Sequence, residues 1–256
     1  MTDVKGKIVL ITGASSGIGK ACAIEFAKSG ANLLLVARRI DRIVKLSDEL
    51  ARQYKIKTKS VRLDVRNYDD VKNLYNKLEN YWKNVDIILN NAGLARGLSK
   101  IYEGDTEHWE EMIDTNIKGL LYITRTFLPQ MVEKMKGHII NIGSTAGHET
   151  YAFGNVYSAT KFAVKALSQS IRLDVLDKGI KVTSVDPGMV ITEFSKVRFS
   201  GDDARANKVY DGIEPLNAKD VADAVIFVAT RPQNVNINQI IITPIQQASS
   251  TQVYRK

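Results

Sequence analysis

The stretch VLITGASSGIGKA, residues 9–21, decides the fold of this chain. It joins a short apolar run to a turn that holds Gly13, Gly17 and Gly19, and it continues into a helical pattern that stops near Gly30. Glycines at such a place allow backbone N–H groups and a helix N-terminus to approach a pyrophosphate. The spacing Gly-x-x-x-Gly-x-Gly differs from the usual Gly-x-Gly-x-x-Gly, and a purely structural turn is the alternative. The position between a first strand and a first helix favours a nucleotide site.

The rest of the chain alternates short apolar runs with helical patterns. Strands are predicted over residues 7–12, 32–37, 57–65, 85–93, 137–144 and 180–188, with an edge strand before Pro244. Helices are predicted between them, including a long helical region over 107–135. This alternation indicates a parallel sheet covered on both faces, which is a Rossmann-like, doubly wound α/β fold. No linker divides residues 1–256, so we expect a single dinucleotide-binding and catalytic domain, with residues 189–215 as a substrate lid.

Composition excludes several classes of protein. The net charge is +8, but the lysines and arginines are spread along the chain without a nucleic-acid-binding motif, so we expect no nucleic-acid partner. The apolar runs are too short to cross a bilayer and no secretory segment begins the chain, which predicts a soluble cytoplasmic protein without a membrane partner. Cys22 is the only cysteine, and His108, His138 and His148 show no metal-ligand spacing, so neither a disulfide nor a metal site is expected.

The end of the second predicted strand indicates which nucleotide binds. An NAD site usually places a carboxylate there to accept a hydrogen bond from the ribose 2′-hydroxyl. Here the strand ends LLLVARR, with Arg38 and Arg39 in that place. Guanidinium groups suit a 2′-phosphate, and the hydroxyl of Ser15 could assist them. The sequence therefore favours NADP as the cofactor, and two solvated arginines at a helix start are the alternative.

Polar residues follow the fourth and fifth predicted strands, at the same sheet edge as the glycine-rich turn. Ser144 lies in GSTAG (143–147), and Tyr157 and Lys161 lie four apart on one helix face in GNVYSATK. A free tyrosine has a pKa of about 10, and a nearby ammonium group lowers that pKa. We therefore expect Tyr157 to act as an acid–base group beside Lys161, with Ser144 donating to the substrate oxygen. Asn116 lies inside the long helical region, where a kinking residue tied to the backbone is the alternative; a turn cap is the alternative for Ser144.

The ordered set TGASSGIG, NNAG, Asn116, Ser144, Tyr157-x-x-x-Lys161, PG at 187–188 and Thr192 resembles the short-chain dehydrogenases/reductases over essentially the whole chain. That resemblance implies a catalytic set of Asn116, Ser144, Tyr157 and Lys161. It implies that Lys161 also binds the nicotinamide ribose and that Asn116 holds a water linking the lysine to solvent. The implied cofactor-binding set is Gly13, Ser15, Ser16, Gly17, Ile18, Gly19, Arg38, Arg39, Asp64, Val65, Asn91, Ala92, Gly93, Tyr157, Lys161, Pro187, Gly188, Val190 and Thr192.

A closer likeness lies in NIGSTAG, GNVYSATK and TEFSKVRFSGDDARANKVY, which resemble NADP-dependent 3-hydroxy acid dehydrogenases that oxidise serine and allo-threonine. Such a substrate carries a carboxylate, for which Arg198 is the first candidate and Arg96 the second, with Ser144 at the reacting oxygen; a solvated arginine is the alternative for each. Another short-chain carbonyl or 3-oxoacyl thioester reductase and a non-catalytic NADP-binding regulator remain alternative functions. The resemblance also implies a homotetramer.

Overall fold

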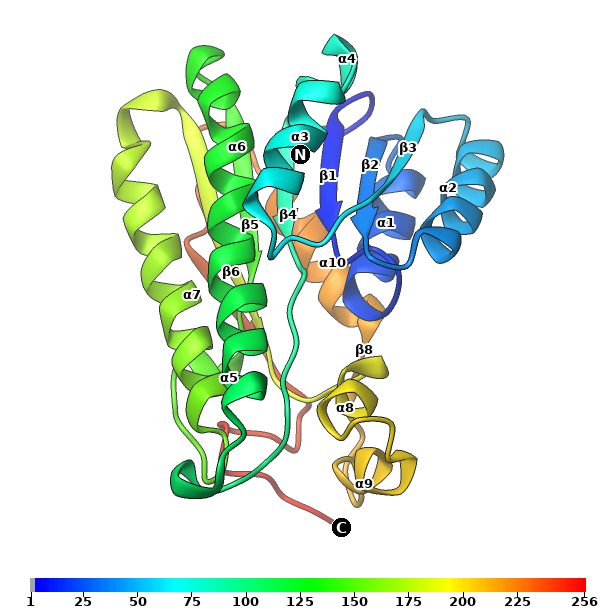
Figure 1. Ribbon diagram of the computed structural model, residues 1–256. Coiled ribbons are helices and arrows are strands. Elements are labelled where there is room, and N and C mark those ends of the chain that lie inside the picture. The colour runs from blue at the N-terminus through cyan, green and yellow to red at the C-terminus, as the bar shows by residue number, and fades with distance from the viewer. Residues whose placement is uncertain (1–2) are drawn as a thin grey trace.

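The computed structural model describes residues 3–256, and within that range seven parallel strands form one sheet with helices on both faces (Figure 1). The strand order is β3-β2-β1-β4-β5-β6-β9, which confirms the predicted doubly wound fold. The direction of winding reverses between β1 and β4, the place where such sheets open a crevice for ligands. The strands are β1 (Ile8–Thr12), β2 (Asn32–Ala37), β3 (Thr58–Arg62), β4 (Ile87–Asn90), β5 (Gly137–Ile142), β6 (Ile180–Pro187) and β9 (Gln239–Ile242).

Alternate strand residues enter two separate cores. Val9 and Ile11 of β1 pack toward the layer that holds α1, α2 and α10, whereas Ile8 and Leu10 pack toward α3, α6 and α7. All five residues of β1 are buried, as expected of a strand covered on both faces. The helices are α1 (Gly17–Lys28), α2 (Ile40–Tyr54), α3 (Tyr68–Lys77), α4 (Asn80–Lys83), α5 (Thr106–Ile113), α6 (Gly119–Glu133), α7 (Asn155–Asp174), α8 (Glu193–Arg198), α9 (Asp203–Lys208) and α10 (Ala218–Ala229).

Two predicted helices are interrupted. The pattern over 68–82 breaks at Leu78 and Glu79, which are extended, so that α3 and α4 are separate. The region 107–135 contains a π-helical turn, η2 (Asp114–Lys118), between α5 and α6. Single π turns inside helices are frequent at functional sites. The hydrophobic period continues through both interruptions, which is why sequence patterning did not detect them.

The strands predicted at the positions of β3 and β4 are longer than the observed ones. The stretches 57–65 and 85–93 pair only over Thr58–Arg62 and Ile87–Asn90, and the residues that follow turn away from the sheet. β9 pairs only with β6, which confirms the predicted edge strand. Residues 189–215, for which the sequence predicts no helix or strand, contain β7 (Val190–Ile191), α8 and α9, and β7 pairs with β8 (Leu216–Asn217). Elements this short give no readable period.

Among residues 3–256, no helix combines the length and the apolar character that crossing a membrane requires. No cluster of three or more histidine, cysteine or acidic side chains in that same range could hold a metal ion. Cys22 is fully buried on α1, and burial raises the pKa of its thiol. It is therefore a packed core residue rather than a reactive one.

Candidate active site

A cavity of about 760 Å³ opens at the carboxyl ends of the strands. It runs from the turn after β1 past the ends of β2, β4, β5 and β6 to α8, so residues far apart in the sequence share one space. Three residues of the predicted sets, Gly19, Asn116 and Arg96, do not line it. The predicted residues that line it are Gly13, Ser15, Ser16, Gly17, Ile18, Arg38, Arg39, Asp64, Val65, Asn91, Ala92, Gly93, Ser144, Tyr157, Lys161, Pro187, Gly188, Val190, Thr192 and Arg198.

The glycine-rich turn is fixed to the segment after β4. Gly13 and Gly17 have positive φ angles of 66° and 52°, which side chains disfavour. The amide of Asn91 donates to the carbonyls of Thr12 (2.9 Å) and Gly13 (3.3 Å), while the Thr12 hydroxyl accepts from the backbone of Asn91 and Ala92 at 2.9 Å. Sequence reasoning missed Thr12, because only the fold brings it beside residues 91 and 92.

Gly19 supports the turn from behind instead of lining the cavity. A Cβ at this position would lie 2.5 Å from both the Gly13 carbonyl oxygen and the Asn91 amide nitrogen. Gly19→Ala is therefore expected to destabilise the fold by about 1–3 kcal/mol through overpacking, and to lower Tm by roughly 3–10 °C, as measured by thermal denaturation. Lys20→Ala, one residue along and exposed, is the control, and an equal Tm for both variants would refute the close-packing account.

Arg39 connects the glycine-rich turn to α8. Its guanidinium donates to the hydroxyls of Ser15 (3.0 Å) and Ser16 (2.7 Å) and to the carboxylate of Glu193 (2.8 Å). Glu193 also accepts from Arg42 at 2.7 Å. Burial acts to raise the pKa of Glu193, but the hydrogen bonds and charges of the two arginines hold it below its usual value. Glu193 was absent from the sequence prediction, since a glutamate in a polar stretch carries no pattern of its own.

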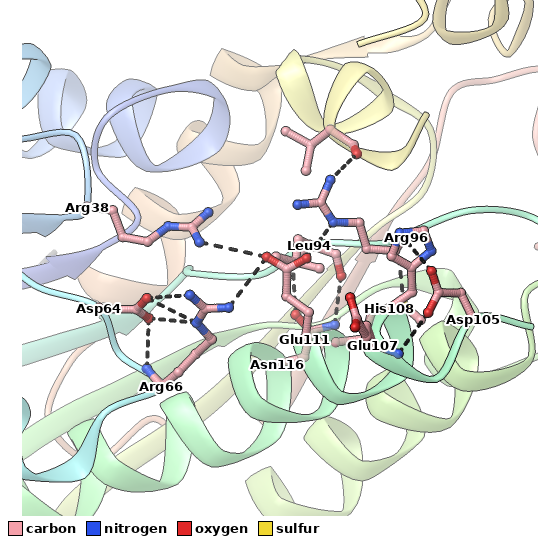
Figure 2. A network of polar contacts seen from close by, with 12 residues as sticks. Arg38, Asp64, Arg66, Leu94, Arg96, Asp105, Glu107, His108, Glu111 and Asn116 are labelled. Atoms are coloured by element: carbon pink, nitrogen blue, oxygen red, sulfur yellow. Dashed lines mark hydrogen bonds and ion pairs between the residues drawn. The ribbon is translucent and has the colours of Figure 1, made fainter. Parts of the chain in front are cut away.

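Arg38 and Asp64 occupy the far wall of the cavity, within the network of Figure 2. The Asp64 carboxylate accepts hydrogen bonds from Arg66 at 2.6–3.0 Å. Burial acts to raise the pKa of Asp64, but these hydrogen bonds and the charge of Arg66 outweigh it and lower the pKa. Arg38 has a half-exposed side chain and reaches Glu111 only at 3.8 Å, so its guanidinium is free to turn toward an anion.

Arg96 and Arg198 differ in their partners. Figure 2 shows Arg96 directed at Glu111, to which it donates at 2.6 Å, and it also donates to the Val197 carbonyl at 2.8 Å. Arg96 is thus neutralised outside the cavity. Arg198 lines the cavity, with its guanidinium 5.5 Å from the ring centres of Tyr151 and Tyr157. It donates to the Tyr151 hydroxyl at 2.7 Å, and none of the described carboxylates forms an ion pair with it.

Tyr157 and Lys161 lie one turn apart on α7 and are both buried. The Lys161 ammonium donates to the Ile142 carbonyl at 2.9 Å and lies 5.9 Å from the Tyr157 ring centre. Burial lowers the pKa of Lys161 to about 8. Burial also raises the pKa of Tyr157, and the groups that act to lower it are Ser144, by a hydrogen bond, and Arg198, by its charge. The expectation that Lys161 lowers the pKa of Tyr157 is therefore not met in the protein chain alone.

Ser144 follows β5 and begins the short 3₁₀ helix η3 (Thr145–Gly147). Its hydroxyl accepts from the Ala146 backbone at 3.1 Å, which is the turn cap considered from the sequence. The same hydroxyl can donate, and it forms a hydrogen bond with Tyr157. The cap and the contact with the tyrosine thus coexist, and the cap fixes where the hydroxyl points.

Asn116 lies in the π-helical turn and is almost fully buried. Its side chain accepts from the Leu94 backbone N–H and donates to the Leu94 carbonyl, both at 2.9 Å, and it donates to Thr160 at 3.0 Å (Figure 2 shows the bonds to Leu94). The structure therefore shows the alternative considered for Asn116, a residue in an irregular helical turn whose side chain is hydrogen-bonded to the backbone. Asn116 still borders Lys161, because both would contact a Cβ at Gly93, at 3.3 and 3.8 Å.

A glycine-rich turn, paired arginines and a Ser–Tyr–Lys group in one cavity define a dinucleotide-binding α/β protein of the oxidoreductase class. The chain belongs to the short chain dehydrogenase family, whose sequence model matches residues 7–203. It is 45% identical over 242 residues to the NADP-dependent 3-hydroxy acid dehydrogenase YdfG of Salmonella typhi, covering 94% of this chain and 96% of that protein.

Two further similarities extend over nearly the whole chain. The NADP-dependent 3-hydroxy acid dehydrogenase of Schizosaccharomyces pombe is 40% identical, covering 100% of this chain and 99% of that protein. The solved closed form of a serine dehydrogenase complexed with NADP+ superposes with a TM-score of 0.92 and 44% identity, covering 97% of this chain and 100% of that chain. Both the family and the closer likeness predicted from the sequence are confirmed.

Proposed function

We propose that this protein is an NADP-dependent oxidoreductase that oxidises small 3-hydroxy acids such as serine, allo-threonine or 3-hydroxypropionate to the 3-oxo acids. The observation that carries the proposal is Arg198, a cation without an ion-pair partner among the described residues, directly beside the Tyr157 ring in the cavity. A substrate that spans from a carboxylate at Arg198 to a hydroxyl at Tyr157 must be short. The similarity to relatives named for this activity supports the same substrate class.

In this proposal each side chain has one task. A bound nicotinamide would supply hydride exchange at the carbinol carbon of the substrate. Tyr157 takes the proton from the substrate hydroxyl during oxidation and returns it during reduction. Ser144 donates a hydrogen bond to the reacting oxygen and holds it against Tyr157. Arg198 binds the carboxylate and fixes the substrate's direction.

Lys161 is proposed to bind the nicotinamide ribose and, as an ammonium, to favour the tyrosinate when the cofactor is in place. A cation can do this only while it is protonated, so its pKa of about 8 makes its charge sensitive to pH near neutrality. The side chain of Asn116 is already bonded to Leu94 and Thr160, so a water that links Lys161 to solvent would be held by the backbone of η2.

The residues present fit a dinucleotide. Gly13 and Gly17 line the cavity at positive φ, where a Cβ would press on Ala92 or Thr192, so the backbone itself borders the space, and the cavity lies within the usual size range of ligand sites. Ser15, Arg38 and Arg39 are proposed to hold the 2′-phosphate, with Asp64 and Val65 near the adenine. Asn91, Ala92 and Gly93 line the middle of the cavity. Pro187, Gly188, Val190 and Thr192 are proposed to hold the carboxamide.

Arg39→Ala is expected to raise the Kd for NADPH by about 10- to 100-fold, because a charged hydrogen bond to the 2′-phosphate is lost. The Kd for NADH should change little, and fluorescence titration measures both. Arg42→Ala is a matched control. It removes the other arginine that pairs with Glu193, and the Arg42 side chain forms no hydrogen bond with Ser15 or Ser16, whereas Arg39 binds both. Equal weakening for NADPH and NADH, or an equal effect of Arg42→Ala, would contradict the assignment.

Initial-rate assays test the function directly. NADP and NAD should be compared with L-serine, D-serine, L-allo-threonine, 3-hydroxypropionate, 3-hydroxyisobutyrate and malonic semialdehyde. We expect turnover of the hydroxy acids with NADP. Activity confined to acyl thioesters or uncharged carbonyls would favour another short-chain reductase, and NADP binding without any turnover would favour a regulator.

Residues 189–215 are proposed to act as a lid within a single domain. The segment carries Arg198 and is tied to the opposite wall by the bond from the Gly97 N–H to the Arg198 carbonyl at 2.9 Å. Its far end is tied to the C-terminus, where the Lys256 N–H donates to the Gly212 carbonyl. The related serine dehydrogenase complexed with NADP+ was solved in a closed form, which supports a movement of this kind.

We further propose a cytoplasmic homotetramer. Exposed apolar side chains on α7 and after β9, among them Leu173 (73% exposed) and Ile245 (100% exposed), would be covered by subunit contacts. Light scattering of the purified protein measures the number of subunits, and a monomer at working concentration would refute the proposal.

A further inference from the structure

One buried carboxylate has no task in the proposed mechanism. Asp186 lies near the end of β6, and only 1% of it is exposed. Its carboxylate lies so close to Gly143 that a Cβ there would overlap it. The neighbouring residue, Ile142, presents the carbonyl that accepts from the Lys161 ammonium. Asp186 therefore lies next to the Ile142–Gly143 peptide, whose carbonyl binds Lys161 and which leads into the turn that carries Ser144.

Asp186 is held by three side chains. It accepts hydrogen bonds from the Ser184 hydroxyl, from the Gln239 amide on β9, and from the His148 ring at 2.7 Å. The Nδ1 atom of His148 faces the Lys165 ammonium at 3.3 Å, and an ammonium can only donate. We therefore assign the ring proton to Nε2, which donates to Asp186; the Gln239 amide nitrogen, 3.1 Å from Nε2, then donates to the same carboxylate and not to the ring. Three side-chain donors therefore converge on this one carboxylate.

The turn that carries Ser144 is held at both ends and packs on α7. The turn starts with the bond from the Gly143 N–H to the Val185 carbonyl at 2.9 Å and ends at His148. Between them, Gly147 packs so closely on α7 that a Cβ would lie 2.6 Å from the Lys161 carbonyl oxygen. The turn of residues 143–148 therefore connects Asp186 and His148 on one side to the α7 backbone at Lys161 on the other.

Lys161 needs a negative charge nearby, because burial disfavours its ammonium form. Tyr157 faces it from the same helix and carries no charge when protonated. Burial has the larger effect on the pKa of Lys161 and lowers it, and the charge of Asp186, which lies against Gly143 next to the Ile142 carbonyl, acts to raise it. Asn116 borders Lys161 from η2 but is neutral.

We propose that Asp186, fixed by His148 and Gln239, is the buried counter-charge that keeps Lys161 in its ammonium form. It touches neither substrate nor cofactor in this proposal, so it is a positioning residue that acts through Lys161. The consequence for turnover rests on the proposed function, whereas the effect on the charge of Lys161 does not.

The test measures the ionisation of Lys161 without cofactor or substrate. Protein labelled with ¹³C at the lysine Cε is titrated by NMR, and Lys161→Arg identifies the signal. In Asp186→Asn the pKa of Lys161 is expected to fall by about 1 unit or more below that of the wild type, since an opposite charge is lost nearby. The ammonium is then lost at a lower pH. An unchanged pKa would overturn the proposal.

His148→Gln separates charge from packing. It keeps the Asp186 carboxylate and offers it an amide donor, so the pKa of Lys161 should remain near the wild-type value. A fall as large as in Asp186→Asn would mean that local disturbance, not charge, sets the pKa, and would overturn the proposal. Asp186→Ser, which is smaller and also uncharged, repeats the test if the asparagine variant does not fold.

The pH profile of kcat supplies a second readout. In Asp186→Asn the alkaline limb should move to lower pH, in the direction that NMR records, whereas a merely structural lesion lowers kcat at every pH. An NMR shift without any hydroxy acid turnover in the wild type would refute the proposed function and leave this inference standing. Turnover of hydroxy acids by the wild type, together with an unshifted Lys161 signal in Asp186→Asn, would support the proposed function and refute the role of Asp186.

Discussion

Tyr157→Phe is expected to lower kcat by about 10³-fold or more, because it removes the acid–base group and leaves the rest of the cavity unchanged. The Kd for NADPH should stay within about threefold, since the lost hydroxyl contributes at most one hydrogen bond to cofactor binding. Stopped-flow or steady-state assays with a 3-hydroxy acid give kcat, and fluorescence titration gives the Kd. The buried ring continues to fill its place beside Phe194, with the ring centres 5.6 Å apart, so the fold should be retained.

Tyr210→Phe is the matched control for this prediction. Tyr210 also lines the cavity, and its hydroxyl contacts Ser195 at 2.7 Å and donates to the Val190 carbonyl at 2.9 Å. Its removal should affect kcat far less than removal of the Tyr157 hydroxyl. A Tyr157→Phe protein with wild-type turnover would show that Tyr157 and Lys161 are an ordinary helix pair.

Arg198→Ala is expected to lower kcat/KM for serine and 3-hydroxypropionate by about 10²-fold or more, because a substrate carboxylate then loses the cation that lines the cavity. The loss should appear mainly in KM. An uncharged alcohol of the same length, such as propane-1,3-diol, should show a much smaller change. Steady-state kinetics with both substrates measure the difference, and an equal effect on both would contradict the assignment of Arg198 to the carboxylate.

Lys208→Ala controls for the change in lid charge, since Lys208 lies on α9, is exposed and does not line the cavity. It should leave both substrates nearly unaffected. Arg198→Lys should recover part of the loss, because it keeps the charge but not the two-pronged geometry of the guanidinium. These variants together separate recognition of a carboxylate from a general change in electrostatics.

Much of the fold followed from local pattern. The place of β2 between β1 and β3 follows from apolar residues on both faces, such as Leu33 on one and Leu34 on the other, and the sequence shows these directly. The interruptions were not predictable, because the π turn at Asn116 keeps the apolar period of the helices around it. The short helices α8 and α9, six residues each, are stabilised by caps and tertiary contacts rather than by an amphipathic pattern.

The same division applies to the candidate site. The ordered motifs predicted which residues border one cavity, from the turn at Gly13 to Tyr157 and Lys161, because strand ends in a parallel sheet meet at one edge. The motifs did not predict that Arg96 is bound to Glu111 or that Glu193 bridges Arg39 and Arg42. Those pairs join residues between 15 and 154 positions apart, which no local spacing encodes.

The sequence by itself determined the fold, the family and the chemical types gathered at the sheet edge, because periodicity and motif order are properties of the chain. Only the tertiary structure decided which charges are free. Arg198 lines the cavity, and no carboxylate among residues 3–256 pairs with it, while Arg96 is neutralised by Glu111; burial raises the pKa of Tyr157 in spite of the nearby Lys161. The physical reason is that desolvation and ion pairing depend on what surrounds a group in space, and residues such as Asp186 and His148, distant in sequence, provide those surroundings.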